Sequence, residues 1–381
     1  MSTEVPSLAQ ALSLIPDFRQ AQGRRYDLLP LLLLASVAVL CGCRSQAAIS
    51  DWGKNYGPRW LRKLGFSSER APSQPTLHRI FKGIDHLLIE QALTTWSQKV
   101  LAVLSSTSST ELEPVAIDGK TLCGSSKQGA RDAHLLSCIS HRLGIVLAQV
   151  AVSDKTNEIT KVDDLLEGLV LTGKVVTGDA MITQRAIAEK ILSKGGDYLL
   201  VVKDNQPQLL EDIKMSFADY WWIRDTITTD SLTDQHGNRV QMWHLQASTL
   251  MEGYSSWPGL KQVLKLKREV ANKSTGEVRE ETSYAVTSLG REQAGPAELI
   301  KIWREHWHIE NRLHWVRDVT YDEDRSQVRS GHIPQVMAAL RNAAISVMRI
   351  MGQNNIAAAC RRYAAQPALA LAAVGIDREN E

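Results

Sequence analysis

Residues 114–119 read Pro-Val-Ala-Ile-Asp-Gly, a short apolar run that ends in an acid and a turn residue. Three apolar residues between Pro and Asp-Gly predict a short buried strand, with Asp118 as the first polar group at its end. Residues 174–179, Lys-Val-Val-Thr-Gly-Asp, repeat the pattern and end in Asp179. Because sites in α/β proteins form where strands of the sheet end, the two acids are candidate functional residues.

The segment around these two strands alternates between strand and helix patterns. Residues 135–139 and 145–152 predict a β-hairpin. Residues 162–169 and 184–193 predict helices before and after the second Asp strand, and residues 197–202 predict a further strand. A hairpin followed by alternating helices and strands predicts a mixed α/β sheet with helices packed on it.

The sequence on both sides of this segment has a different character. Residues 1–104 carry helical apolar spacing, and a Ser/Thr-rich linker at residues 105–110 separates them from the sheet. Residues 209–295 carry alternating patterns and predict a β-rich insertion. The predicted domains are residues 1–104 (helical), 111–208 with 296–351 (catalytic), 209–295 (insertion) and 352–381 (helical tail).

Composition and charge limit the class of protein. The net charge is +2, but residues 44–82 contain eight Lys or Arg against two acids. That excess fits either a polyanion such as DNA or a solvated basic surface. Five cysteines without metal-binding spacing indicate reduced thiols in a cytoplasmic protein. The longest apolar run, residues 28–43, is short for a membrane span and predicts a buried helix, and no signal peptide is expected.

Part of this basic excess falls on a predicted helix. Residues 73–76, Ser-Gln-Pro-Thr, form a helix-start signal, and the apolar residues that follow at Leu77, Ile80 and Phe81 have helical spacing. His78, Arg79 and Lys82 are then expected on the opposite, exposed side. The pattern is compatible with a helix-turn-helix-like DNA contact and with a small helical bundle that carries its charges outside.

Residues 298–317 contain no Pro or Gly and predict one helix with Glu310 near its centre. Neither a surface helix nor a core helix would normally mix an acid, aromatic and basic residues on one face. We therefore expect Glu310 to join the two aspartates in a metal site, although a single Asp after a strand more often caps a turn. The residues that share this face at helical spacing are Trp303, His306, Trp307, Glu310, His314 and Arg317.

The chemistry of the proposed site follows from its ligands. Mg²⁺ prefers oxygen ligands, so three carboxylates suit it. Two such ions about 3.5–4 Å apart activate a nucleophile and stabilise the leaving oxygen of a phosphoryl displacement. The spacing of His306, Glu310 and His314 leaves a zinc site as an alternative. The acidic residues that follow, from Asp318 to Asp324, predict a solvated loop, with the alternative that one of them replaces Glu310 as third ligand or orients basic residues.

Three motifs together resemble the DDE transposases of bacterial insertion sequences, in the group that includes the H-repeat-associated proteins. They are Ala-Ile-Asp-Gly-Lys-Thr around Asp118, Gly-Asp-Ala-Met-Ile-Thr-Gln around Asp179, and His-Trp-His-Ile-Glu-Asn-Arg-Leu-His-Trp around Glu310. Residues 26–30 and 72–77 are similar to the helical domain that precedes the catalytic domain in that group. The resemblance implies an RNase H-like fold with a β insertion before the third acid.

The resemblance also implies site residues. Asp118, Asp179 and Glu310 would be catalytic and would hold two Mg²⁺ ions, with Mn²⁺ as an alternative. Related transposases carry the signature Tyr, two residues, Arg, three residues, Glu, six residues, Lys, and the three positions around Glu310 hold Trp, His and Arg here. These replacements, with other nearby basic residues, are expected to contact DNA: Trp303, Arg304, His306, Arg312, Arg317 and Lys120.

The expected function is hydrolysis of a phosphodiester at element ends, followed by transfer of the free 3′-OH to target DNA, as in cut-and-paste transposition. Double-stranded DNA is the expected partner, bound by a homodimer or a larger assembly, and no membrane partner is expected. Two alternatives stay open. One is a catalytically inactive DNA-binding relic of an insertion sequence, and the other is an RNase H-like nuclease that cuts without joining.

Overall fold

The computed structural model describes residues 5–22, 24–105, 112–123, 133–152, 158–218 and 223–376. All but the first residue of the predicted Ser/Thr-rich linker lies outside the described residues. The chain divides into two compact units, residues 1–111, 119–169 and 308–381 (unit 1) and residues 112–118 and 170–307 (unit 2). The boundary crosses strand β1 (Glu113–Thr121), so this strand belongs to both units. The four domains predicted above follow other boundaries and stay a prediction.

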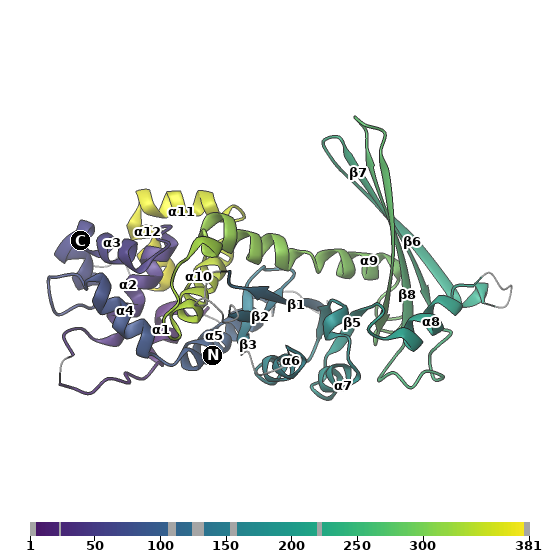
Figure 1. Ribbon diagram of the computed structural model, residues 1–381, viewed down its shortest axis with the longest axis horizontal. Coiled ribbons are helices and arrows are strands. Elements are labelled where there is room, and N and C mark those ends of the chain that lie inside the picture. The colour runs from purple at the N-terminus through teal and green to yellow at the C-terminus, as the bar shows by residue number, and fades with distance from the viewer. Residues whose placement is uncertain are drawn as a thin grey trace. The chain divides into compact units, whose positions relative to one another are not determined.

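Unit 1 begins with helices, as predicted (Figure 1). Helix α2 is buried along almost its whole length because its sequence is apolar on every side. No helix among the described residues is long and apolar enough to cross a membrane. Helix α3 was not predicted, and Gly57 interrupts it with a φ of 71°. The five helices are α1 (Leu8–Ser13), α2 (Leu28–Leu40), α3 (Gln46–Lys63), α4 (Gln74–Gly83) and α5 (His86–Ser105).

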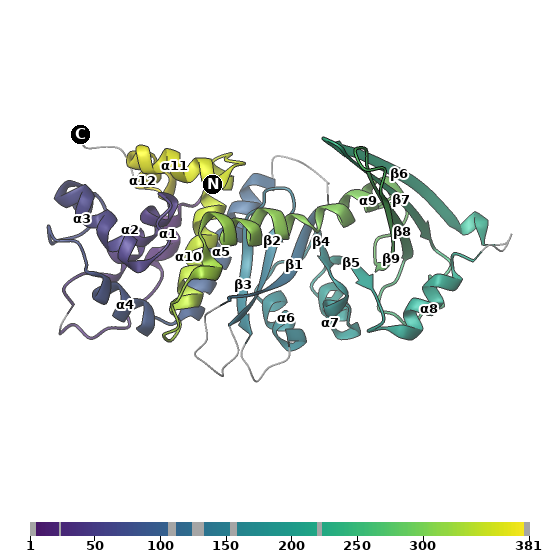
Figure 2. The ribbon, with the colours of Figure 1, turned by 45° about the horizontal axis from the view of Figure 1, so that its top comes forward.

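The rest of unit 1 combines a hairpin with C-terminal helices. Strands β2 (His134–Ser140) and β3 (Val146–Val152) pair antiparallel, which confirms the predicted hairpin. Helix α6 (Glu158–Glu167) packs on both strands, while α5 and α10 pack on β3 (Figure 2). Three C-terminal helices pack against α2, so the apolar α2 is the centre of this helical core: α10 (Ile333–Ile350), α11 (Ile356–Ala365) and α12 (Pro367–Val374).

Unit 2 is built on parallel strands that an antiparallel ribbon extends. Strand β4 (Lys174–Gly178) pairs parallel with β1, and β5 (Asp197–Val202) pairs parallel with β4. Helices α7 (Arg185–Ser193) and α8 (Pro207–Met215) flank β5 in the sequence. The strand order is β3-β2-β1-β4-β5-β9-β8-β7-β6. A hairpin beside β1, with β4 and β5 parallel to it, is the RNase H-like arrangement that the resemblance implied.

Within the described part of the predicted β-rich insertion, four strands pair antiparallel. Strand β9 pairs with β5, which joins the insertion to the parallel strands. Helix α9 (Pro296–Glu305) packs on β6 and β7, and its apolar residues share a core with Trp243 and Leu245. Strand β6 was missed because its sequence is largely polar. The strands are β6 (Ile227–His236), β7 (Arg239–Ser248), β8 (Gln262–Asn272) and β9 (Val278–Thr287).

The helix predicted over residues 298–317 is not one regular α-helix. Helix α9 ends at Glu305, and the chain continues in two π-helical segments, η3 (Glu310–His314) and η4 (Val316–Thr320). A π-helix bonds residue i to i+5, so its wider turn no longer keeps side chains three residues apart on one face, although Glu310 and His314, four residues apart, still meet. The predicted shared face is therefore wrong. Trp307 is 63% exposed, whereas Arg317 is completely buried.

Candidate active site

The two aspartates lie at neighbouring positions of adjacent strands in unit 2. Strands β1 and β4 run parallel and pair Ile117 with Gly178, and the next residue of each strand is Asp118 or Asp179. Parallel neighbours in this register place both acids at the same level of the sheet. Asp118 does not end its strand, since β1 continues to Thr121, but pairing with β4 stops before it.

Asp179 uses its carboxylate locally. Its Oδ1 accepts a hydrogen bond of 3.0 Å from the backbone N–H of Met181, and the residue is the N-cap of a short 3-10 helix, η1 (Ala180–Ile182). Its side chain is exposed. This is the turn-capping role that an aspartate after a strand often has.

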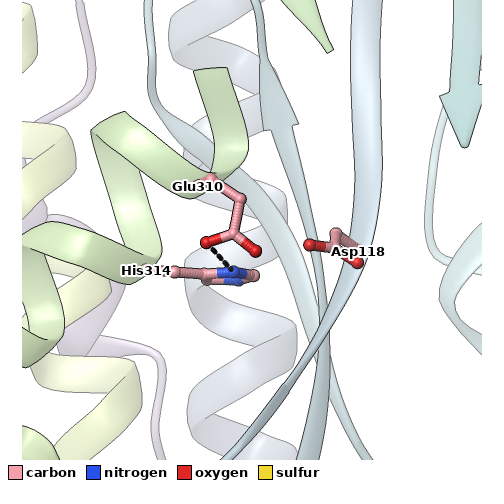
Figure 3. A group of neighbouring side chains, drawn as sticks. All are labelled: Asp118, Glu310 and His314. Carbon is pink, nitrogen blue, oxygen red and sulfur yellow. Dashed lines mark ion pairs between the residues drawn. The ribbon is translucent and has the colours of Figure 1, made fainter. Parts of the chain in front are cut away.

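Glu310 and His314 face each other within η3 (Figure 3). Nδ1 of His314 lies 3.6 Å from Oε2 of Glu310. Asp118, on β1, completes a group in which one ligand atom from each side chain lies within 4.8 Å of the others (Figure 3). The two carboxylates are half-buried and His314 is 3% exposed. The described residues thus bring together two of the three predicted acids, with His314 in the group instead of Asp179.

This donor set suits a divalent cation. Carboxylate oxygens bind Mg²⁺ and Mn²⁺, and an imidazole nitrogen adds affinity for transition metals. Half-burial favours an ion because a carboxylate that leaves water needs a positive partner. The zinc alternative named His306 as a third ligand, but Nδ1 of His306 lies 2.9 Å from the hydroxyl of Thr177 and the residue does not belong to the group.

The predicted DNA contacts in unit 2 have protein partners. Arg304 forms an ion pair with Asp234, and its guanidinium carbon lies 4.7 Å from the centroid of the Trp243 ring. Its side chain nevertheless remains 39% exposed. Trp303 is partly buried against the core of the insertion. Of the predicted contacts in this unit, Arg304 therefore keeps the largest share of surface for a phosphate.

Two predicted contacts in unit 1 are held by neighbouring groups. Lys120 is 9% exposed, and its Nζ lies 2.6 Å from Asp318 and 3.5 Å from Asp324. Burial raises the pKa of Asp318, and the Lys120 ammonium opposes that shift. Arg312 is half-buried and donates from Nη1 to the carbonyl of His141 at 2.7 Å. Lys120 thus ties β1 to Asp318 of η4 and to Asp324, and Arg312 ties η3 to the β2–β3 turn.

The burial of Arg317 and of its partner Glu323 contradicts two predictions. Its side chain is 0% exposed, and its Nε donates to Oε2 of Glu323 at 2.7 Å. A side chain without exposed surface cannot contact DNA, so that prediction is wrong. The solvated loop predicted over the acidic run is also wrong for Glu323, which is 3% exposed. Burial alone would raise the pKa of Glu323, but Arg317 and Arg341 outweigh it and hold the pKa below its ordinary value.

Comparison with known proteins shows the family to which the chain belongs. A family model described as the transposase DDE domain matches residues 109–347, and one described as DDE_Tnp_1-associated matches residues 9–97. The chain belongs to the DDE transposase family. The first match contains Asp118, Asp179 and Glu310, and the second covers most of the N-terminal helices of unit 1.

Relatives of this DDE transposase family member cover nearly its whole length. It is 32% identical to the putative transposase YncI of Escherichia coli O157:H7, over 91% of this chain and 88% of that protein. It is 30% identical to the H repeat-associated putative transposase YhhI of Escherichia coli K12, over 91% of each. It also aligns with a piggyBac transposase synaptic complex with hairpin DNA, at a TM-score of 0.42 and 11% identity over 98% of this chain and 77% of that one.

Sequence reasoning did not assign His314 to the metal site with the acids. The i, i+4 spacing from Glu310 is its signal in the sequence, and that spacing alone points only to the zinc alternative. In the structure that spacing falls within a single π-helical segment and places the imidazole beside the carboxylate.

Proposed function

We propose that this protein is an active transposase that hydrolyses a phosphodiester at the ends of its element and joins the free 3′-OH to target DNA. The observation that supports this most directly is the group formed by Asp118, Glu310 and His314. Two of its members are acids of the motifs that identify the family, and the third is a buried imidazole beside one of them.

Asp118, Glu310 and His314 would hold one divalent ion, Mg²⁺ or Mn²⁺. Asp179, the lateral neighbour of Asp118, is proposed as the further ligand that a second ion requires. When bound, such ions supply the positive charge that makes water or a 3′-OH a better nucleophile and stabilises the leaving oxygen. Nδ1 of His314 lies 3.6 Å from Glu310, so the imidazole would offer a nitrogen donor beside that carboxylate when an ion is bound.

DNA binding is assigned to exposed cations of the helical N-terminal region. In α4, Leu77, Ile80 and Phe81 are buried and Arg79 and Lys82 are exposed, as predicted, whereas His78 is partly buried beside Gln46. Helix α3 and the loop after it add further exposed cations, namely Arg59, Arg62 and Arg70. These groups would neutralise backbone phosphates, with Arg304 and Arg312 as additional contacts, and a homodimer or larger assembly would hold two DNA ends.

The test uses the purified chain with Mg²⁺ and duplex DNA from the borders of its own element. The wild-type protein should nick the duplex at the element end, and Asp118→Asn should abolish nicking while DNA binding remains. Binding without metal-dependent nicking by the wild-type protein would favour the inactive relic. Pre-cleaved ends with a free 3′-OH separate the other alternative, because a simple nuclease cuts but yields no joined product.

A further inference from the structure

Arg317 is a charged side chain placed where it has no access to water. It belongs to η4, three residues after His314, and its side chain is 0% exposed. A buried guanidinium is costly unless carboxylates and other acceptors surround it. The partners of Arg317 therefore show what this segment of the helix is fastened to.

The first partner, Glu323, is shared between two cations. Its Oε2 accepts from Nε of Arg317 at 2.7 Å, and its Oε1 accepts from Nη1 of Arg341 at 2.6 Å. Arg341 lies in α10 and also donates to the backbone carbonyl of Arg44 at 3.1 Å. One buried carboxylate thus joins η4 to α10.

The second partner, Gln149, ties the same guanidinium to the sheet. Its Oε1 accepts from Nη1 of Arg317 at 3.3 Å and from Nδ2 of Asn342 at 2.7 Å. Its Nε2 donates to Oε1 of Glu90 in α5 at 2.6 Å. Gln149 belongs to β3, so η4 is fastened to β3 and, through that strand, to α5.

We propose that Arg317 is a positioning residue for the metal site: Glu323 and Gln149 hold η4, and η4 in turn fixes the orientation of the adjoining segment η3, which carries Glu310 and His314. This inference rests on the proposed metal-dependent function. A π-helical segment is wound differently from the α-helix before it, and contacts outside the helix help to set its rotation. Two hydrogen bonds from one planar guanidinium, to a strand and to a carboxylate shared with α10, determine that rotation.

The planar geometry of the guanidinium suggests a substitution that tests the proposal. Arg317→Lys keeps the positive charge beside Glu323, so the buried carboxylate is not left alone. An ammonium on a shorter side chain cannot reproduce the planar fork that reaches Glu323 and Gln149 together. The variant should therefore fold, yet hold Glu310 and His314 less firmly. Gln149→Met is a second variant, which removes an acceptor of Arg317 and leaves the ion pair with Glu323 in place.

The experiment is titration calorimetry of the full-length protein with Mn²⁺, without DNA. The Mn²⁺ dissociation constant should rise about tenfold for Arg317→Lys and several-fold for Gln149→Met. Substitutions of residues that orient metal ligands in other proteins have effects of this size. Circular dichroism should remain that of the wild-type protein. The control is Arg325→Lys, because Arg325 lies in the same acidic segment but is 85% exposed, and this variant should bind Mn²⁺ as the wild-type protein does.

Affinity for duplex DNA in metal-free buffer separates positioning from phosphate contact. Positioning predicts that Arg317→Lys and Arg317→Gln leave the dependence of affinity on salt unchanged. Wild-type Mn²⁺ affinity in Arg317→Lys and Gln149→Met would overturn the network proposal alone, and so would a shallower salt dependence in a folded Arg317→Gln protein. A wild-type chain that binds no Mn²⁺ would overturn the proposed metal-dependent function and this inference together.

Discussion

Nδ1 of His314 lies 3.6 Å from Oε2 of Glu310, within one π-helical segment. A carboxylate beside an imidazole selects its tautomer and orients the ring, as in many metal sites. Because His314 is almost fully buried and Glu310 is half-buried, this interaction is shielded from water more than a surface pair would be. The pair gives the proposed active site a nitrogen donor in addition to its carboxylates.

Replacing His314 should weaken metal binding and the reaction together. We expect His314→Ala to raise the Mn²⁺ dissociation constant on the order of 10- to 100-fold and to lower the rate of end nicking about 100-fold. Calorimetry and a gel assay measure the two effects. The matched control is His244→Ala, since His244 is exposed on β7 and bonds to Ser231. Wild-type nicking by His314→Ala would show that the imidazole has only a packing role.

Asp179 offers a variant that separates capping from catalysis. In the Asp179→Asn protein the side-chain amide oxygen could still accept the hydrogen bond from Met181, so the cap should survive and the thermal midpoint should shift little. Removal of the charge should nevertheless lower nicking at least about 100-fold if Asp179 binds a metal ion. Asp179→Ala should in addition lose about 1 kcal/mol of stability. Full activity of the Asn variant would leave Asp179 as a turn cap.

The basic surface of α4 should appear in the salt dependence of DNA binding. Removing Arg79 and Lys82 together should reduce the slope of log affinity against log salt by roughly 2, since each phosphate contact contributes about 0.9. Fluorescence anisotropy at several salt concentrations gives the slope. Arg279→Ala is the control, because Arg279 is 79% exposed in the insertion and pairs with Glu277. An unchanged slope in the double variant would exclude α4 from the DNA interface.

Glu90 should make the stability of the fold fall with rising pH. Burial raises its pKa from 4.5 to about 8, although the Gln149 hydrogen bond and Arg317 oppose that shift. Between these two values the unfolded chain has lost the proton that the folded chain keeps, so the contribution of Glu90 to stability decreases by about 1.4 kcal/mol per pH unit and is largest below pH 4.5. Glu90→Gln keeps the shape of the side chain and should remove this component. Parallel pH dependence of unfolding in both proteins would contradict the burial of a protonated Glu90.

The sequence alone determined the features that depend on neighbouring residues. Apolar runs that end in Asp placed Asp118 on β1 and Asp179 directly after β4, because strands and turns depend on a few adjacent residues. The helical N-terminal region, the β2–β3 hairpin and the buried α2 followed from apolar spacing in the same way. The motifs around the three acids were enough to indicate the family.

The tertiary structure decided which side chains meet and which charges are buried. Helical spacing predicted a single face from Trp303 to Arg317, but the π-helical segments change the winding and separate these side chains. The apolar pattern of the sequence does not show this change in winding, so it could not be predicted. The sequence predicted Arg317 as a DNA contact, but in the structure it is buried and bonds to Glu323 and to Gln149, 168 positions earlier. Burial of a charge depends on partners that only the folded chain brings together, and so the role of Arg317 could not be deduced from its own neighbourhood.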